Sequence, residues 1–191
     1  MMRNSDEKRR MILDNASKLF SQKGYFGVGI NEILQLCHIP KGSFYHYFPN
    51  GKNQLAVEVI YYAYQMMEDG IKEKIFSFSN DAVEVFQKMA NHLAQGIEQK
   101  KEGFASLLIT FMGIESVYVS EEVNLASKEV YYRWEMLYKE KLIECGYSCE
   151  KAAEYSKLLL TLIHGNLIAC WIRKDATNLY NVVRQLPNIL K

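Results

Sequence analysis

The amino-acid sequence predicts an all-α fold of about nine helices, with a three-helix head at the N-terminus and a larger helical bundle behind it. Apolar residues recur at helical spacing, and no run alternates polar and apolar residues for long enough to form a strand. The 191 residues contain only three prolines and no Gly-rich linker, which favours long helices with short connections. We expect two domains, residues 1–51 and 52–191.

The first helix is expected to run from Ser5 to Lys23. One face carries apolar residues at helical spacing, namely Ile12, Leu13, Ala16, Leu19 and Phe20. Ser5 or Asp6 can cap its start, and Gly24 can end it.

A short second helix is expected after Gly29. This glycine can serve as the N-cap, with Glu32 completing an imperfect capping box three residues later. The buried face of this helix is expected to hold Ile30, Ile33, Leu34 and Cys37.

A tight turn around His38 leads to a third helix from Lys41 to Phe48. Pro40 is well placed near its start, and Pro49 ends it. Two short helices joined by a tight turn, behind a longer first helix, are typical of a helix-turn-helix domain.

Six longer helices are expected in the body. They cover residues 52–76, 80–100, 103–117, 120–145, 149–173 and 176–190. The most apolar stretch, Leu158 to Ile172, is only fifteen residues long and contains polar residues, which indicates a buried bundle helix and not a membrane span. The N-terminus has no apolar run typical of a signal peptide, and the four cysteines form no disulfide framework, so we expect a cytoplasmic protein.

Charge is distributed unevenly along the chain. Residues 1–52 carry eight bases and four acids, a net charge of +4, whereas the remainder carries −3. A basic head on a mildly acidic body suits an anionic polymer bound at one end.

The segment "KGSFYHYF" gathers aromatic and polar groups on the short third helix. Phe44 and Phe48 are four residues apart and share a face that can pack on the first helix. The other sides carry hydroxyls, an imidazole and a lysine, groups that suit phosphate oxygens and base edges in a major groove. The expected DNA contacts are Lys41, Gly42, Ser43, Tyr45, His46, Tyr47 and Lys52.

The segment from Ile12 to Ala56 resembles the DNA-binding domain of TetR/AcrR-family bacterial transcriptional regulators. The resemblance lies in "ILDNASKLFSQKGY", "INEILQLCHIP" and "KGSFYHYF", and the ending "FPNGKNQLA" is similar to that of the LmrA/YxaF-like branch. It implies a homodimer that binds an inverted-repeat operator in double-stranded DNA and represses transcription until a small molecule binds the C-terminal domain.

The resemblance also implies roles for single residues. It implies major-groove contacts from Lys41, Gly42, Ser43 and Tyr45, and phosphate contacts from His46, Tyr47 and Lys52. Three positions depart from the family pattern: Val28 replaces a phosphate-binding Thr, Gly29 replaces a Ser/Thr cap, and His38 replaces a Gly in the turn.

The body carries groups that suit a cavity for a small hydrophobic effector. Apolar walls with a few polar groups describe a ligand pocket, and they describe a helical core equally well. The candidate pocket residues are Phe104, Leu108, Phe111, Met112, Tyr118, Trp134, Tyr138, His164, Asn166 and Trp171. We expect His164 to be a satisfied buried histidine and not a catalyst.

Helices 149–173 and 176–190 are the expected dimer contact. The first is apolar on nearly every side and needs cover all round. The second offers Leu179, Val182, Val183 and Leu186 for the same purpose. A two-fold dimer matches an inverted repeat, because each head reads one half-site.

Other classes of function have less support. The sequence has no nucleotide-binding loop, no His-Glu-x-x-His and no convincing Ser/His/Asp grouping, so we expect no enzyme, cofactor or metal site. Cys145 and Cys149, with Cys170 a helix away, leave open a thiol- or metal-responsive regulator of the same fold. A plain scaffold protein would show no salt-dependent affinity for DNA.

Overall fold

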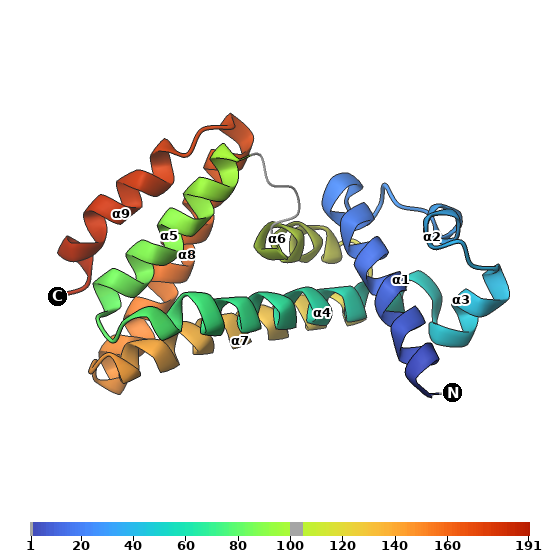
Figure 1. Cartoon of the computed structure of the whole chain (residues 1–191), viewed down its shortest axis with the longest axis horizontal. Coiled ribbons are helices and arrows are strands. Elements are labelled where there is room, and N and C mark those ends of the chain that lie inside the picture. The colour runs from blue at the N-terminus through green and yellow to red at the C-terminus, as the bar shows by residue number, and fades with distance from the viewer. Residues whose placement is uncertain (1, 100–104) are drawn as a thin grey trace. The chain divides into compact units, whose positions relative to one another are not determined.

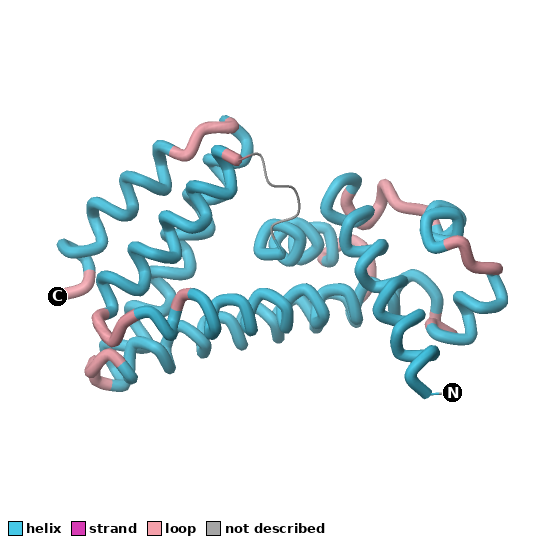
Figure 2. The backbone as a smooth tube through the Cα atoms, in the orientation of Figure 1, coloured by secondary structure: helices cyan, strands magenta, loops and turns pink. Residues whose placement is uncertain are grey.

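The computed structural model describes residues 2–99 and 105–191, and within these ranges the chain forms only helices and loops (Figures 1 and 2). The α-helices are α1 (Met2–Lys23), α2 (Ile30–Cys37), α3 (Lys41–Tyr47), α4 (Gly51–Lys74), α5 (Ala82–Glu98), α6 (Ala105–Ser116), α7 (Glu121–Glu144), α8 (Cys149–Arg173) and α9 (Thr177–Ile189). A short 3-10 helix, Phe76–Phe78, follows α4. The predicted all-α class is confirmed. The predicted helix ends at 100 and 103 lie outside the described residues.

The chain divides into two compact units. Unit 1 contains residues up to 66 together with 105–130, and unit 2 contains residues 67–99 together with 131–191. Unit 1 therefore joins α6 to the three head helices, whereas the sequence suggested a boundary after residue 51. The helices α4 and α7 each contribute residues to both units.

The first helix is longer than predicted. It begins at Met2, so Ser5 and Asp6 lie inside the helix and neither is its N-cap. Its end is confirmed at Gly24, which has a positive φ of 70°.

The capping of α2 differs in part from the prediction. Gly29 is the N-cap, as expected, with an extended backbone. Glu32 does not return to it, because its carboxylate forms an ion pair with Lys23 of α1. At the other end of α2, His38 has the left-handed backbone conformation, with φ 52° and ψ 42°.

The left-handed conformation of His38 makes a testable prediction. A residue with a Cβ destabilises the folded state by about 1–2 kcal/mol in this conformation. Replacing it with glycine removes that cost but adds a smaller one, because glycine loses more conformational entropy on folding. We expect His38→Gly to stabilise the protein by up to about 1 kcal/mol, seen as a rise of about 2–4 °C in the unfolding midpoint. The control is His46→Gly, inside α3, which should lower the midpoint. A lower midpoint for His38→Gly would show that its imidazole makes a stabilising contact.

The core of the head lies under α3. Phe44 and Phe48 are fully buried, with ring centroids 5.4 Å apart. The buried residues that accompany them in the head include Ile12, Ala16, Phe20 and Ile33. The predicted inward face of the third helix is confirmed.

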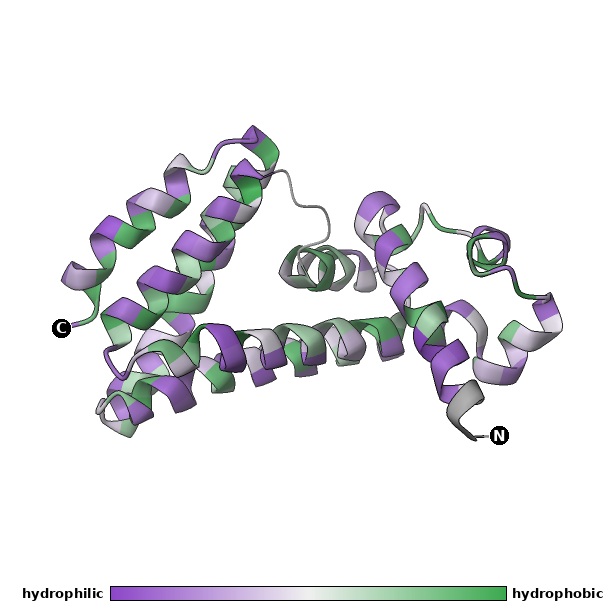
Figure 3. Cartoon of the chain, in the orientation of Figure 1, coloured by the Kyte–Doolittle hydropathy of each residue, from purple (hydrophilic) through white to green (hydrophobic). Residues whose placement is uncertain are grey.

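In unit 2, α9 lies against α5 and α8, and hydrophobic and hydrophilic residues alternate along α5 and α9 at the spacing of helical turns (Figure 3). The buried residues of α9 are Leu179, Val182 and Leu186. These three residues were predicted to face a second subunit. That prediction is wrong, because they are covered within the same chain.

The helix α8 is long and apolar enough to cross a membrane by length and composition alone. In unit 2 it contacts α5 and α9, and eight of its residues are buried, among them Leu159, Ile163 and Leu167. Contacts of this kind are those of a bundle helix, as the sequence predicted.

Candidate nucleic-acid interface

The third helix combines a buried face with an exposed one. Lys41, Gly42 and His46 are exposed, and Tyr45 is 38% exposed, while Phe44 between them is fully buried. The other two predicted contacts in α3, Ser43 and Tyr47, are half-buried. The structure thus brings six of the seven predicted DNA contacts together on one short helix.

Each exposed ring of α3 lies against a neighbouring ring that is more buried. The Tyr45 ring meets the Phe44 ring edge-on at 5.3 Å, and the His46 ring meets the Tyr47 ring edge-on at 5.2 Å. These contacts restrict the two exposed rings. At Gly42 a Cβ atom would meet nothing within 4 Å, so the tip of α3 is open to a ligand.

Lys52, the seventh predicted contact, is engaged inside unit 1. Its Nζ donates a hydrogen bond to the backbone oxygen of Tyr25 at 2.5 Å and lies 3.9 Å from the centre of the Tyr25 ring. Burial lowers the pKa of the Lys52 ammonium, and the nearby charge of Glu115 opposes that shift. Sequence reasoning did not foresee this contact.

Two basic residues of α1 are also engaged. Arg9 forms an ion pair of 2.5 Å with Glu58 of α4, and its guanidinium lies 5.3 Å from the Phe48 ring. Arg10 and Asp14 both bond to the hydroxyl of Tyr62, and the pKa of Arg10 is raised by that hydrogen bond. The net charge of the head therefore overstates the charge available to DNA.

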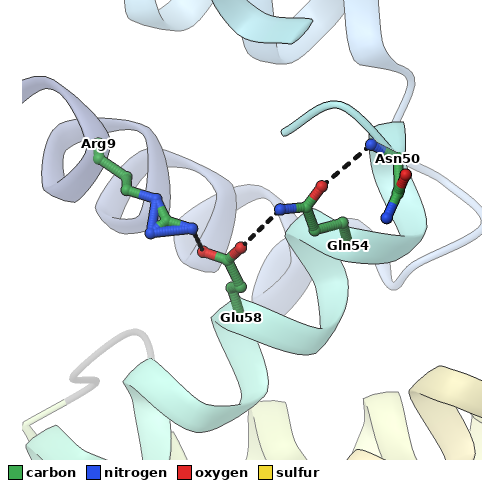
Figure 4. A network of polar contacts seen from close by, with 4 residues as sticks. All are labelled: Arg9, Asn50, Gln54 and Glu58. Carbon is green, nitrogen blue, oxygen red and sulfur yellow. Dashed lines mark hydrogen bonds and ion pairs between the residues drawn. The ribbon is translucent and has the colours of Figure 1, made fainter. Parts of the chain in front are cut away.

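Figure 4 shows how the Arg9 ion pair continues along α4. Gln54 Nε2 donates to the second Glu58 oxygen at 3.0 Å, and Gln54 Oε1 accepts the backbone N–H of Asn50 at 3.0 Å. These interactions join α1 to the turn that follows α3. They stabilise the base of the exposed helix.

Of the three departures from the family pattern, Val28 is buried in the core of the head at 1% exposure. Its side chain packs and offers no hydrogen bond.

Comparisons with known proteins bear on this arrangement. A family model described as bacterial regulatory proteins of the tetR family matches residues 12–59, which contain α2 and α3. A second model, the C-terminal domain of LmrA/YxaF-like transcriptional regulators, matches residues 82–185. The chain belongs to the TetR family, in its LmrA/YxaF-like branch. It is a DNA-binding transcriptional regulator of the TetR family and not an enzyme.

Relatives match along nearly the whole chain. The uncharacterized HTH-type transcriptional regulator YxaF of Bacillus subtilis is 30% identical over 190 residues, covering 100% of this chain and 98% of its own. The HTH-type transcriptional regulator LmrA of the same organism is 31% identical over 188 residues, covering 97% of each.

Solved structures share the fold at lower identity. The crystal structure of reduced NemR from Escherichia coli matches with a TM-score of 0.82 and 20% identity, covering 95% of this chain and 96% of that one. A TetR-family regulator from Agrobacterium tumefaciens matches with a TM-score of 0.80 and 19% identity, covering 96% and 98%.

The candidate effector-pocket residues of this TetR-family chain fall in both units. In unit 1, Leu108 and Met112 are buried, Phe111 is half-buried, and Tyr118 is 81% exposed. Tyr118 is thus a surface residue of its unit, and not the buried wall that the sequence suggested. Phe104 lies outside the described residues.

In unit 2, Trp134 and His164 meet, with ring centroids 3.8 Å apart. The pKa of His164 falls to about 4 because it is buried, and its Nδ1 lies 3.4 Å from the Tyr131 hydroxyl. This neutral, buried imidazole agrees with the expectation of a core histidine. Tyr138 is fully buried and donates to Met89 Sδ at 2.9 Å.

The remaining two candidates lie on α8. Asn166 is half-buried and donates to the backbone oxygen of Leu162 at 2.7 Å, and Trp171 is exposed. A groove of about 560 Å³ in unit 2 has the size of a ligand site, but none of the nine candidates within the described residues lines it. Its lining residues include Lys74, Phe78, Lys88 and His92.

The cysteines give little support to a thiol-responsive regulator. Cys145 is half-buried, and burial raises the pKa of its thiol, which disfavours the reactive thiolate. Cys149 is exposed and Cys170 is buried. In the part of the chain that the structure describes, no group of three His, Cys, Asp or Glu residues could hold a metal ion.

Proposed function

We propose that this TetR-family regulator is a cytoplasmic repressor that binds an inverted-repeat operator as a homodimer and is released by a small hydrophobic effector. The observation that carries the proposal is α3, where Lys41, Tyr45 and His46 are exposed above the fully buried Phe44 and Phe48. A short helix anchored from below and polar on its outer side suits the major groove.

Within α3, the residues divide by position. Lys41, Gly42, Ser43 and Tyr45 are proposed to face base edges, and His46 and Tyr47 to hold phosphates. Lys52, the remaining proposed phosphate contact, is half-buried and has a hydrogen bond to Tyr25, so we assign it a supporting role beside the interface.

The homodimer is proposed to form through the outer side of α8. Leu158, Thr161, Gly165 and Ile172 are exposed there at helical spacing, and no charged residue occurs between Leu158 and Ile172. An uncharged stripe about four turns long on a charged protein suits a second copy of the same helix. With its apolar face covered, α9 contributes polar residues such as Asn181 and Arg184.

The effector is proposed to act on α4, which is separated from α3 by three residues. A shift of α4 would move the recognition helices of the dimer away from their spacing along the duplex. The aromatic groups around Trp134 and Tyr138 favour a flat hydrophobic compound as the ligand.

Selection of bound duplexes from random DNA tests the proposal directly. We expect the purified protein to enrich an inverted repeat, with an affinity that falls steeply between about 50 and 200 mM salt. A scrambled duplex of equal length is the control. Recovery of unrelated sequences at both salt concentrations would contradict the proposed function.

A further inference from the structure

Tyr25, the residue that follows the end of α1 at Gly24, is held at several atoms. Its backbone N–H donates to Glu115 Oε2 at 2.5 Å, and its backbone oxygen accepts from Lys52 Nζ at 2.5 Å. Its hydroxyl donates to Asn53 Oδ1, and its ring stacks on Phe20 at 5.9 Å. One buried residue therefore connects α1, α4 and α6 within unit 1.

The approach of Glu115 requires the glycine before Tyr25. Gly24 has φ 70°, a conformation that residues with a Cβ rarely adopt. A Cβ at this position would also lie 2.5 Å from Glu115 Oε1. Gly24, directly after α1, is thus the residue type that lets a carboxylate of α6 reach the backbone at this point.

The charges on the two sides of Tyr25 are complementary. The carboxylate of Glu115 accepts from its N–H, while the ammonium of Lys52 donates to its oxygen. Hydrogen bonds with one charged partner are stronger than neutral ones, so both contacts restrict the Tyr25 backbone. The helix-turn-helix lies between these anchors, because α1 ends just before it and α4 begins just after it.

We propose that Glu115 is a positioning residue for operator binding. It fixes Tyr25 and, through Lys52 and Asn53, the start of α4, so the placement of α2 and α3 depends on α6. The state of α6 therefore reaches the recognition helix through Tyr25, which contacts both the end of α1 and the start of α4. The inference rests on the proposed function as a sequence-specific DNA-binding protein.

The first test compares Glu115→Ala, Glu115→Gln and the control Glu121→Ala in the full-length protein. Glu121 is an exposed residue of the same unit, in the first turn of α7. We expect Glu115→Ala to weaken binding of the selected operator about tenfold to a hundredfold, Glu115→Gln to weaken it less, and Glu121→Ala to leave it unchanged. Affinity for the scrambled duplex should be equal in the wild type and these three variants.

Amide hydrogen exchange provides a readout that does not involve DNA. The Tyr25 amide should exchange about tenfold faster or more in Glu115→Ala, because its charged acceptor is removed. A side chain that only stabilises the fold would lower the unfolding midpoint and leave the operator affinity of the folded protein unchanged. That result would overturn the positioning role.

The variant Lys52→Met distinguishes two roles for Lys52, a hydrogen bond that holds Tyr25 and a contact with a DNA phosphate. We expect lower operator affinity with an unchanged slope of log K against log salt concentration. If Lys52 neutralised a phosphate, the variant would instead show a slope smaller in magnitude by about 0.9, which would overturn the role given to Lys52. Normal binding by Glu115→Ala refutes the positioning role only, whereas wild-type protein without sequence preference refutes it together with the proposed function.

Discussion

Phe44→Ala is expected to destabilise unit 1 by about 3–5 kcal/mol, the largest effect of any single truncation in α3. The Phe44 ring is fully buried and contacts the rings of Phe48 at 5.4 Å and Tyr45 at 5.3 Å. Its removal leaves a cavity under a helix of only seven residues, which has little helical stability of its own. Chemical denaturation followed by circular dichroism measures the change.

The matched control for this substitution is the next residue in the chain. Tyr45 is 38% exposed, so Tyr45→Ala should cost no more than about 1 kcal/mol while weakening operator binding. The two variants should therefore separate stability from recognition. Equal losses of stability would mean that Tyr45 belongs to the core of the head, and the assignment of α3 faces would be wrong.

The assignment of faces in α3 illustrates what the sequence predicts well. Phe44 and Phe48 are four residues apart, and this local spacing alone places them on one side of a helix. The helices of the body were equally predictable from the sequence, because their apolar residues recur at helical spacing over long segments and the breaks between them fall at small or polar residues. Local patterns thus predict elements and their buried faces.

Contacts between distant residues were not predictable in the same way. The partner of Lys52 is 27 residues away in the sequence, and that of Glu115 is 90 residues away. Nothing near Lys52 distinguishes a lysine that binds phosphate from one that binds a backbone oxygen. Packing decides between the two, and packing is a property of the whole unit.

The last helix shows a related limit. Its period correctly predicted that Leu179, Val182 and Leu186 share a buried face, but not which surface covers them. They lie in the chain's own core, with α9 against α5 and α8. An amphipathic pattern reports that a face is covered, and it does not report whether the cover comes from the same chain.

The exposed face of α8 contains a glycine, Gly165, that packing within the described residues does not explain. Gly165 lies in the middle of this helix and is exposed, and a Cβ there would meet no side chain or other segment of the described residues within 4 Å. A mid-helix glycine costs about 1 kcal/mol relative to alanine. Since nothing among the described residues requires a small side chain here, Gly165 supports the proposed close approach of a second subunit.

Gly165→Lys is therefore expected to dissociate the dimer while leaving the protomer folded. The lysine meets open space within the protomer and has a better helix propensity than glycine, but it places a charge on the uncharged stripe between Leu158 and Ile172. Sedimentation velocity should show monomers, and operator affinity should fall about 10²–10⁴-fold, because linked binding of two half-sites is abolished.

The control for this variant is Gly70→Lys, which changes another helical glycine whose added Cβ would meet nothing within 4 Å, near the end of α4 instead of in α8. It should leave the dimer intact. Dimers that persist in Gly165→Lys would place the interface on another surface, and a loss of operator affinity without dissociation would show that α8 influences the head within one chain. The α8 stripe is connected to operator recognition only if Gly165→Lys both dissociates the dimer and weakens operator binding. In that case α3 of each protomer is unchanged, and affinity is lost because a monomer binds only one half-site.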